Sequence, residues 1–231
     1  HYTPDTGKVY FEGNAIEFGN TSNAIKLGIG MVHQHFTLAE NLTVLENIII
    51  GRQSIFSLSL PKRQARVRIL ELSKKFGLPI DPDELVANLS VSEKQRIEIL
   101  KTLFLDCKLL ILDEPTAALT PQETDALFST IRNMIETGLS VILISHKLNE
   151  ILAVSDRIIV LRNGSSVGEI DTNSADREKI AEMIVGKKID YPQKKKIPRK
   201  SKVLSLVDVS YNKTDAPNLN KVNLDLYGGQ I

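Results

Sequence analysis

The sequence has little cysteine, no excess of charge of either sign and no long hydrophobic run. Cys107 is the only cysteine among 231 residues, which excludes an internal disulfide framework and fits a reducing compartment. The net charge is only +1, so no overall field attracts nucleic acid or an anionic membrane. No apolar run approaches the roughly 18 residues that a membrane-spanning helix needs. We therefore expect any membrane role to come through a partner.

Strand and helix signals alternate over much of the chain. After the helical part, they follow in the order strand 109–113, helix 121–137, strand 141–145, helix 147–153 and strand 157–161. Strands separated by helices predict a parallel sheet with right-handed crossovers. Asn163-Gly164 is a strong hairpin signal, and one more helix is expected over residues 175–185.

Residues 55–107 are expected to form a helical subdomain. Apolar residues from Ala65 to Phe76 recur at intervals of four, three and four, which places them on one helix face. Ser90 can begin a second helix, because its hydroxyl can accept an exposed backbone N–H. Upstream, short strands are expected over 8–12 and 29–34, and short helices over 24–27 and 43–50.

A change of composition divides the chain. Residues 187–202 hold two prolines and many lysines, which predicts an exposed linker, with a solvated basic stretch favoured over nucleic-acid contact. Strand signals return at 203–209 and 222–226. We expect a first domain over residues 1–186 and the beginning of new β structure over 203–231.

Two adjacent carboxylates, Asp113 and Glu114, end the apolar run that starts at Leu109. Asp113 is a candidate ligand of Mg²⁺, which prefers oxygen donors. Glu114 is a candidate catalytic base that would orient or deprotonate an attacking water. The alternative is a strand followed by an ordinary acidic turn.

Polar residues also follow two other predicted strands. His146 comes after the strand 141–145, where an imidazole could stabilise charge on a transferred phosphoryl group and brace Glu114. The alternative is a surface histidine at the start of a helix. Gln34 follows the strand that begins at Ile29. Its amide could touch Mg²⁺ or the water and relay their presence to a mobile loop.

The order and spacing of these motifs resemble the nucleotide-binding subunit of an ABC transporter. The family's signature is LSGGQ, and this chain has Leu89-Ser90-Val91-Ser92-Glu93 at the start of a predicted helix. Helix N-termini bind phosphate, so the resemblance implies that Ser90, Ser92 and Glu93 contact a nucleotide held mainly by the opposite subunit. Ser92 places a side chain where the family has glycine and where closest approach is wanted.

The resemblance implies an α/β fold of the P-loop NTPase type, with a parallel sheet, a helical subdomain and an antiparallel β layer. The phosphate-binding motif G-x-x-x-x-G-K-[ST], whose backbone N–H groups and lysine cradle phosphates, is missing. The Gly-Lys pairs Gly7-Lys8 and Gly186-Lys187 lack its other elements. The chain thus resembles a piece of a tandem ATPase without the strand and helix of that loop, and we expect no ATP turnover from it alone.

Pro115–Glu123 resembles the first half of duplicated importer ATPases for simple sugars and nucleosides. This implies ATP and Mg²⁺ as cofactors and membrane permease subunits as partners, with a solute-binding protein as an indirect partner. ATPase halves would pair head to tail at the cytoplasmic face of the membrane, without nucleic acid. The transported solute cannot be read from an ATPase half. Alternatives are a soluble ABC protein of translation or DNA repair and a degenerate regulatory half, to which Ser92 points.

Overall fold

The computed structural model describes residues 4–50, 62–187, 201–212 and 218–229. These residues fall into two units, His1–Gly186 and Lys187–Ile231, each of which is described by itself. Most of the predicted linker, and the beginning of the predicted helical subdomain, lie outside the described residues.

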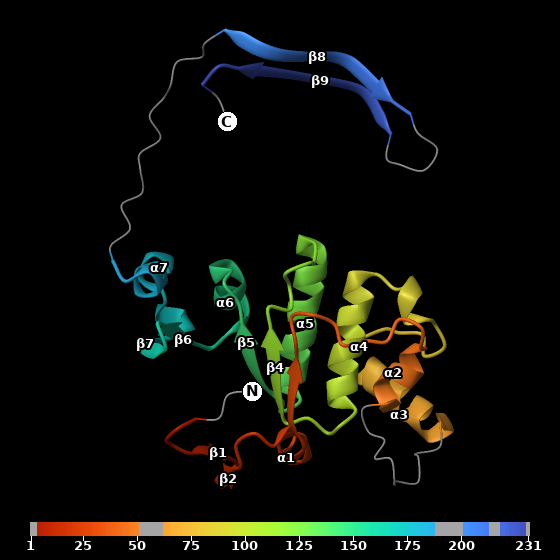
Figure 1. The fold of residues 1–231 in the computed structure, drawn as a ribbon, viewed down its shortest axis with the longest axis vertical. Helices are drawn as coiled ribbons and strands as arrows, with labels where there is room; N and C mark the ends of the chain where they lie inside the picture. Colours follow the sequence, from red (N-terminus) through yellow and green to blue (C-terminus); the bar gives the residue numbers. More distant parts are fainter. Residues whose placement is uncertain (1–3, 51–61, 188–200, 213–217, 230–231) are drawn as a thin grey trace. The chain divides into compact units, whose positions relative to one another are not determined.

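The first unit is built on a parallel sheet, as the sequence predicts, but among the described residues the strand expected over 157–161 lies outside it, in a separate antiparallel hairpin (Figure 1). Its strands are β3 (Ile29–Val32), β4 (Leu109–Asp113) and β5 (Ser140–Ile144), hydrogen-bonded in the order β3-β4-β5. Val32 is in register with Leu112, and Asp113 is in register with Ile144. The carboxyl ends of all three strands therefore meet at one edge of the sheet.

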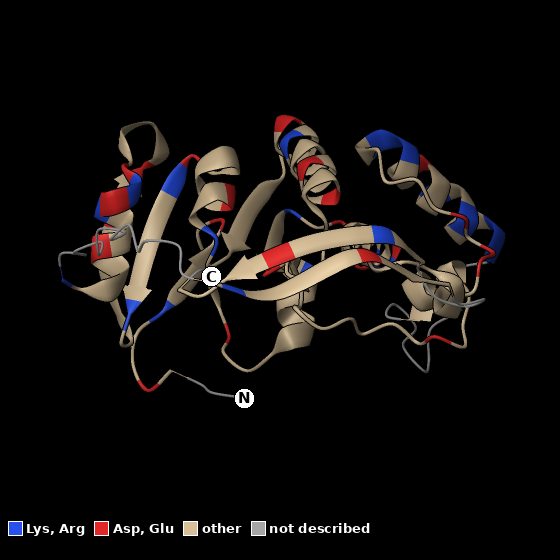
Figure 2. Ribbon diagram, turned by 90° about the horizontal axis from the view of Figure 1, so that it is seen from above, with Lys and Arg blue, Asp and Glu red and all other residues tan. Residues whose placement is uncertain are grey.

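One face of this sheet carries the main hydrophobic core. Helices α4 (Val91–Leu103) and α5 (Pro121–Glu136) pack on that face, and α2 (Val44–Ile50) and α3 (Lys62–Phe76) extend the core away from it. Leu110 and Leu112 of β4 are fully buried there. Lys and Arg recur along α3 between its apolar positions (Figure 2), as the predicted amphipathic helix requires.

Gly30 allows α4 to lie directly against β3. A Cβ atom at this position would collide with the methyl group of Thr102, and it would also approach the sulfur of Cys107 to 3.1 Å. Only glycine leaves room for this contact. The Thr102 methyl group, near the C-terminal end of α4, is therefore seated directly against the backbone of β3.

The opposite face of the sheet remains partly exposed. Met31, Ile142 and Ile144 are each between 41% and 47% exposed. The near-continuous apolar runs of these strands are typical of sheets covered on both faces. In the described residues, full burial is confined to the face under α4 and α5.

Shorter elements complete the first unit. Helix α1 (Thr21–Leu27) leads into β3, whereas β1 (Val9–Phe11) and β2 (Asn14–Ile16) form an antiparallel pair. The Asn163-Gly164 turn has positive φ at both residues and joins β6 to β7, which confirms the predicted hairpin. A second small core lies under this hairpin. The elements around it are α6 (Leu148–Val154), β6 (Arg157–Arg162), β7 (Ser165–Asp171) and α7 (Arg177–Val185).

The second unit contains one antiparallel pair, β8 (Lys202–Tyr211) and β9 (Leu219–Tyr227). Both strands lie where the sequence predicts them, and both are longer than expected. Across the described residues of both units, no helix has the length and apolar character needed to cross a membrane.

Candidate functional site

The candidate site residues gather at the carboxyl edge of the parallel sheet. Gln34 lies two residues beyond the end of β3, Asp113 and Glu114 lie at the end of β4, and His146 lies two residues beyond β5. Since neighbouring parallel strands end at this edge in register, three chain segments far apart in sequence contribute to one region. Ligands of open α/β sheets bind at such an edge.

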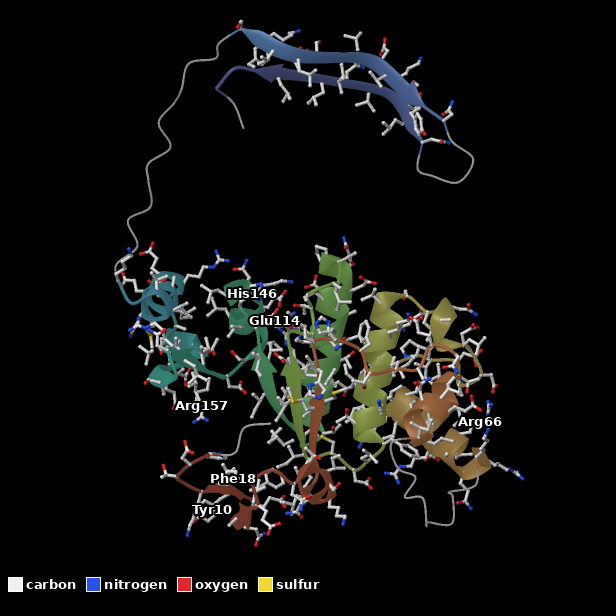
Figure 3. The ribbon with its side chains drawn as sticks, in the orientation of Figure 1. Tyr10, Phe18, Arg66, Glu114, His146 and Arg157 are labelled. Atoms are coloured by element: carbon white, nitrogen blue, oxygen red, sulfur yellow. The ribbon has the colours of Figure 1, made fainter. Side chains whose placement is uncertain are left out.

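Glu114 and His146 are in direct contact (Figure 3). The distance from His146 Nδ1 to Glu114 Oε1 is 2.7 Å. The Glu114 side chain is 25% exposed and the His146 side chain 69% exposed, so the carboxylate is the more sheltered partner. With the proton on Nδ1, the imidazole donates this hydrogen bond to the carboxylate, which fixes the orientation of the ring. The two predicted catalytic side chains thus form one unit.

The backbone of Glu114 is left-handed, with φ of 46°. Non-glycine residues seldom adopt this region, and it persists where the surroundings fix it. One restraint is the backbone N–H of Glu114, which donates to the carbonyl of Ile144 at 2.9 Å. This bond continues the β4–β5 ladder by one residue.

A polar cluster that the sequence analysis did not identify is formed by residues that closely follow Glu114 and His146 in the chain. Thr116 is 1% exposed, and its hydroxyl donates to Glu150 Oε2 at 2.5 Å. The Lys147 ammonium lies 3.0 Å from Glu150 Oε1 and donates to the Thr116 carbonyl at 3.0 Å. Glu150 was missed because it lies in the first turn of α6, where an acidic residue is common on account of the helix dipole.

At the start of α4, Ser90 and Glu93 form a capping box. The Glu93 carboxylate accepts from the Ser90 hydroxyl at 2.7 Å and from the Ser90 backbone N–H at 2.9 Å. These bonds hold the pKa of Glu93 below its ordinary value. The predicted cap is confirmed, and both side chains satisfy each other within the helix end.

Ser92 reaches the next helix. Glu123 lies in the first turn of α5, and its pKa is lowered first by the backbone N–H of Thr120 and then by the Ser92 side chain. Thr120 and Glu123 form a second capping box. Ser92, the residue that replaces the family's glycine, thus influences the carboxylate at the start of α5.

The loop after Gln34 is tied to the middle of α4. Glu98 is 6% exposed, and its Oε1 accepts from the backbone N–H and the hydroxyl of Thr37 at 2.5 and 2.9 Å. Lys101 completes the group, with its ammonium 3.1 Å from the Thr37 hydroxyl. Glu98 was missed because a charged residue in a helix usually faces solvent.

The donor set fits a partial site for Mg²⁺ and a nucleotide phosphate. Asp113 and Glu114 offer carboxylate oxygens, and Gln34 offers an amide oxygen. Such ligands suit a hard cation that retains waters and phosphate ligands. Within the described ranges, no group of three or more His, Cys, Asp or Glu side chains forms a complete protein cage. Bound Mg²⁺ would supply charge neutralisation at the phosphate oxygens.

The structure brings Glu114 and His146 together and places Asp113 and Gln34 at the same edge. It does not join them to the α4 start: in the part of the chain that is described, no hydrogen bond or ion pair links Ser90, Ser92 or Glu93 to that edge. The site therefore consists of two separate surfaces, a sheet edge and a helix start.

Comparison with known proteins identifies a common family. The model of the ABC transporter family matches residues 1–117. The chain is 40% identical over 230 residues to the nucleoside import ATP-binding protein NupA of Lactococcus lactis subsp. cremoris. It is 34% identical over 232 residues to the guanosine import ATP-binding protein NupO of Bacillus subtilis. These alignments cover 99% and 100% of the chain but only 46% of each relative.

Solved structures agree on the fold. The ADP conformation of MJ1267, an ATP-binding cassette of an ABC transporter, superposes with a TM-score of 0.67 over 79% of this chain and 78% of that chain, at 24% identity. A nucleotide-free ATP-binding cassette gives the same TM-score at 23% identity. The predicted fold class is confirmed.

Proposed function

Since the chain belongs to the ABC transporter family, we propose that it forms part of the ATP-hydrolysing subunit of an importer for nucleosides or simple sugars. The single observation that carries the proposal is the 2.7 Å contact between Glu114 and His146 at the carboxyl edge of the sheet. Relatives named as nucleoside and guanosine import ATP-binding proteins support the solute class.

In this proposal Glu114 takes a proton from, or orients, the water that attacks the terminal phosphate of ATP. His146 holds the Glu114 carboxylate at 2.7 Å and presents a polar edge to the phosphate oxygens, where charge increases in phosphoryl transfer. Asp113 and Gln34 provide oxygen ligands to Mg²⁺ from the same sheet edge. The pairing of Glu114 with His146 argues against a degenerate regulatory half.

The start of α4 serves a second nucleotide in this proposal. Its free N–H groups and macrodipole favour a phosphate that is held mainly by the opposite ATPase half, in a head-to-tail pair. Permease subunits in the membrane are the proposed partners, which would place the protein peripherally at the cytoplasmic face. A solute-binding protein would act through the permease.

The test supplies the phosphate-binding element and measures turnover. A strand, a G-x-x-x-x-G-K-[ST] loop and a helix are grafted ahead of His1, and Mg-ATP hydrolysis is compared between this chain and its Glu114→Gln variant. We expect Glu114→Gln to lower kcat on the order of a hundredfold. Glu136→Gln, an exposed carboxylate at the end of α5, is the matched control. Equal turnover in the Glu114→Gln chain would contradict the assignment.

A further inference from the structure

We infer that Glu150 is a positioning residue for the Glu114–His146 pair. Through Thr116, its half-buried carboxylate fixes the turn after β4 to the start of α6, and so sets the hydrogen bond between the two candidate catalytic side chains. The contact itself is independent of ATP. Only its consequence for turnover rests on the proposed function.

Glu150 is a half-buried charge that the proposed chemistry does not use. Its side chain is 12% exposed, although it lies in the first turn of a short surface helix. Both carboxylate oxygens are engaged: Oε2 accepts from Thr116 at 2.5 Å, and Oε1 lies 3.0 Å from the Lys147 ammonium. A buried carboxylate is tolerated where it is paired and hydrogen-bonded in this way.

The contacts join the two segments that carry the catalytic candidates. Thr116 lies two residues after Glu114, and Lys147 directly follows His146. Lys147 donates to the Thr116 carbonyl at 3.0 Å, while Glu150 accepts from the Thr116 hydroxyl. Lys147 and Glu150, both from the segment after β5, therefore hold Thr116 in the turn after β4.

This double attachment explains how the strained backbone of Glu114 persists. Its left-handed φ of 46° is fixed on one side by the bond to the Ile144 carbonyl. The Thr116 contacts fix the other side, two residues on. A catalytic pair whose members come from two segments must be held within about 0.5 Å of its productive geometry. Glu150 provides that restraint through its contact with Thr116.

The test reads the geometry of His146 directly in the 231-residue chain. The imidazole ¹⁵N shifts of His146, assigned with a His146→Gln variant, report its tautomer and the hydrogen bond to Glu114. A Glu114→Ala variant defines the shifts without that bond. We expect Glu150→Leu and Thr116→Val to move the His146 shifts toward that reference.

Two variants keep the necessary atoms and act as rescue controls. Thr116→Ser retains the hydroxyl donor, and Glu150→Gln retains an oxygen acceptor for Thr116. Both are expected to keep the wild-type His146 shifts. Glu178→Leu removes a carboxylate from the first turn of α7 and controls for the loss of a charge at a helix start. It should leave the His146 shifts unchanged.

The outcomes separate a positioning role from a structural one. If Glu150→Leu and Thr116→Val lower the thermal midpoint but leave the His146 shifts at wild-type values, the inference is wrong. Should Glu150→Leu fail to fold, Thr116→Val and its serine rescue decide the question. A shift of the His146 signals in Thr116→Val that Thr116→Ser reverses would support it.

A second measurement tests whether the clamp formed by Glu150, Thr116 and Lys147 affects turnover. In the chain with a grafted phosphate-binding loop, Thr116→Val should lower kcat on the order of ten- to a hundredfold and leave KM for ATP unchanged. Shifted His146 signals together with no ATP turnover in any variant would support the clamp and contradict the proposed function. Unshifted signals in a chain whose turnover depends on Glu114 would contradict the clamp alone.

Discussion

Replacement of Glu98 by alanine should release the loop that follows Gln34. The Glu98 carboxylate accepts two hydrogen bonds from Thr37, at 2.5 and 2.9 Å, and hydrogen bonds to charged groups contribute about 1.5–3 kcal/mol each. Because Thr37 is itself exposed, water replaces part of this loss. We expect Glu98→Ala to lower the free energy of unfolding by about 3 kcal/mol.

Glu98→Gln provides the sharper comparison, because it keeps the oxygen that accepts from Thr37. It loses only the charge and the ion pair with Lys101, whose ammonium lies 3.8 Å from the second carboxylate oxygen. Its expected loss is about 1 kcal/mol. Glu71→Ala, at an exposed position of α3, is the control and should stay within about 0.5 kcal/mol.

Urea unfolding followed by far-ultraviolet circular dichroism measures these differences, since every helix of the described residues lies in the first unit. Amide hydrogen exchange at Thr37 reports the local effect. Faster exchange is expected in Glu98→Ala but not in Glu98→Gln. Equal losses of stability in the two variants, or unchanged exchange at Thr37 in both, would refute the reasoning.

Three further predictions concern the core, a helix end and the cysteine. Leu112→Ala, at a position with 0% exposure in β4, should lower the free energy of unfolding by about 2–5 kcal/mol in urea titrations. The pKa of Glu93 is lowered by its bonds to Ser90, so its stabilising effect is present above its ordinary value of 4.5 and is lost as pH falls; Glu93→Gln should flatten the acid limb of a stability–pH curve. Burial raises the pKa of Cys107 to about 11, so iodoacetamide should alkylate it far more slowly in the native chain than in urea at neutral pH, as mass spectrometry can measure. The same shift predicts stability lost as pH rises from 9.0 toward 11.

Much of the fold could be predicted because its signals are local. The apolar run ending at two carboxylates predicts β4 at the residues where the structure has it, 109–113. Asn163-Gly164 predicts its hairpin because few other residue pairs adopt positive φ twice. The convergence of Glu114 and His146 then follows from the parallel order of the strands, since consecutive strands of such a sheet end at one edge.

The supporting contacts could not be predicted, because they depend on partners distant in sequence. Glu98 finds Thr37 at a separation of 61 residues, and Glu150 finds Thr116 at 34. Each glutamate has the residue type of a solvent-facing helix position, and only tertiary packing makes it an anchor. The role of Ser92 likewise emerges from Glu123 on a neighbouring helix.

The absence of a side chain at Gly30 has a mechanical consequence. The Thr102 methyl group of α4 occupies the space that a side chain at residue 30 would fill, so even an alanine there would push the helix away from β3. In the proposed head-to-tail pair the first turn of α4 would face one nucleotide, and Gln34, two residues beyond β3, would face the other. A larger residue at position 30 would therefore alter the spacing between these two surfaces.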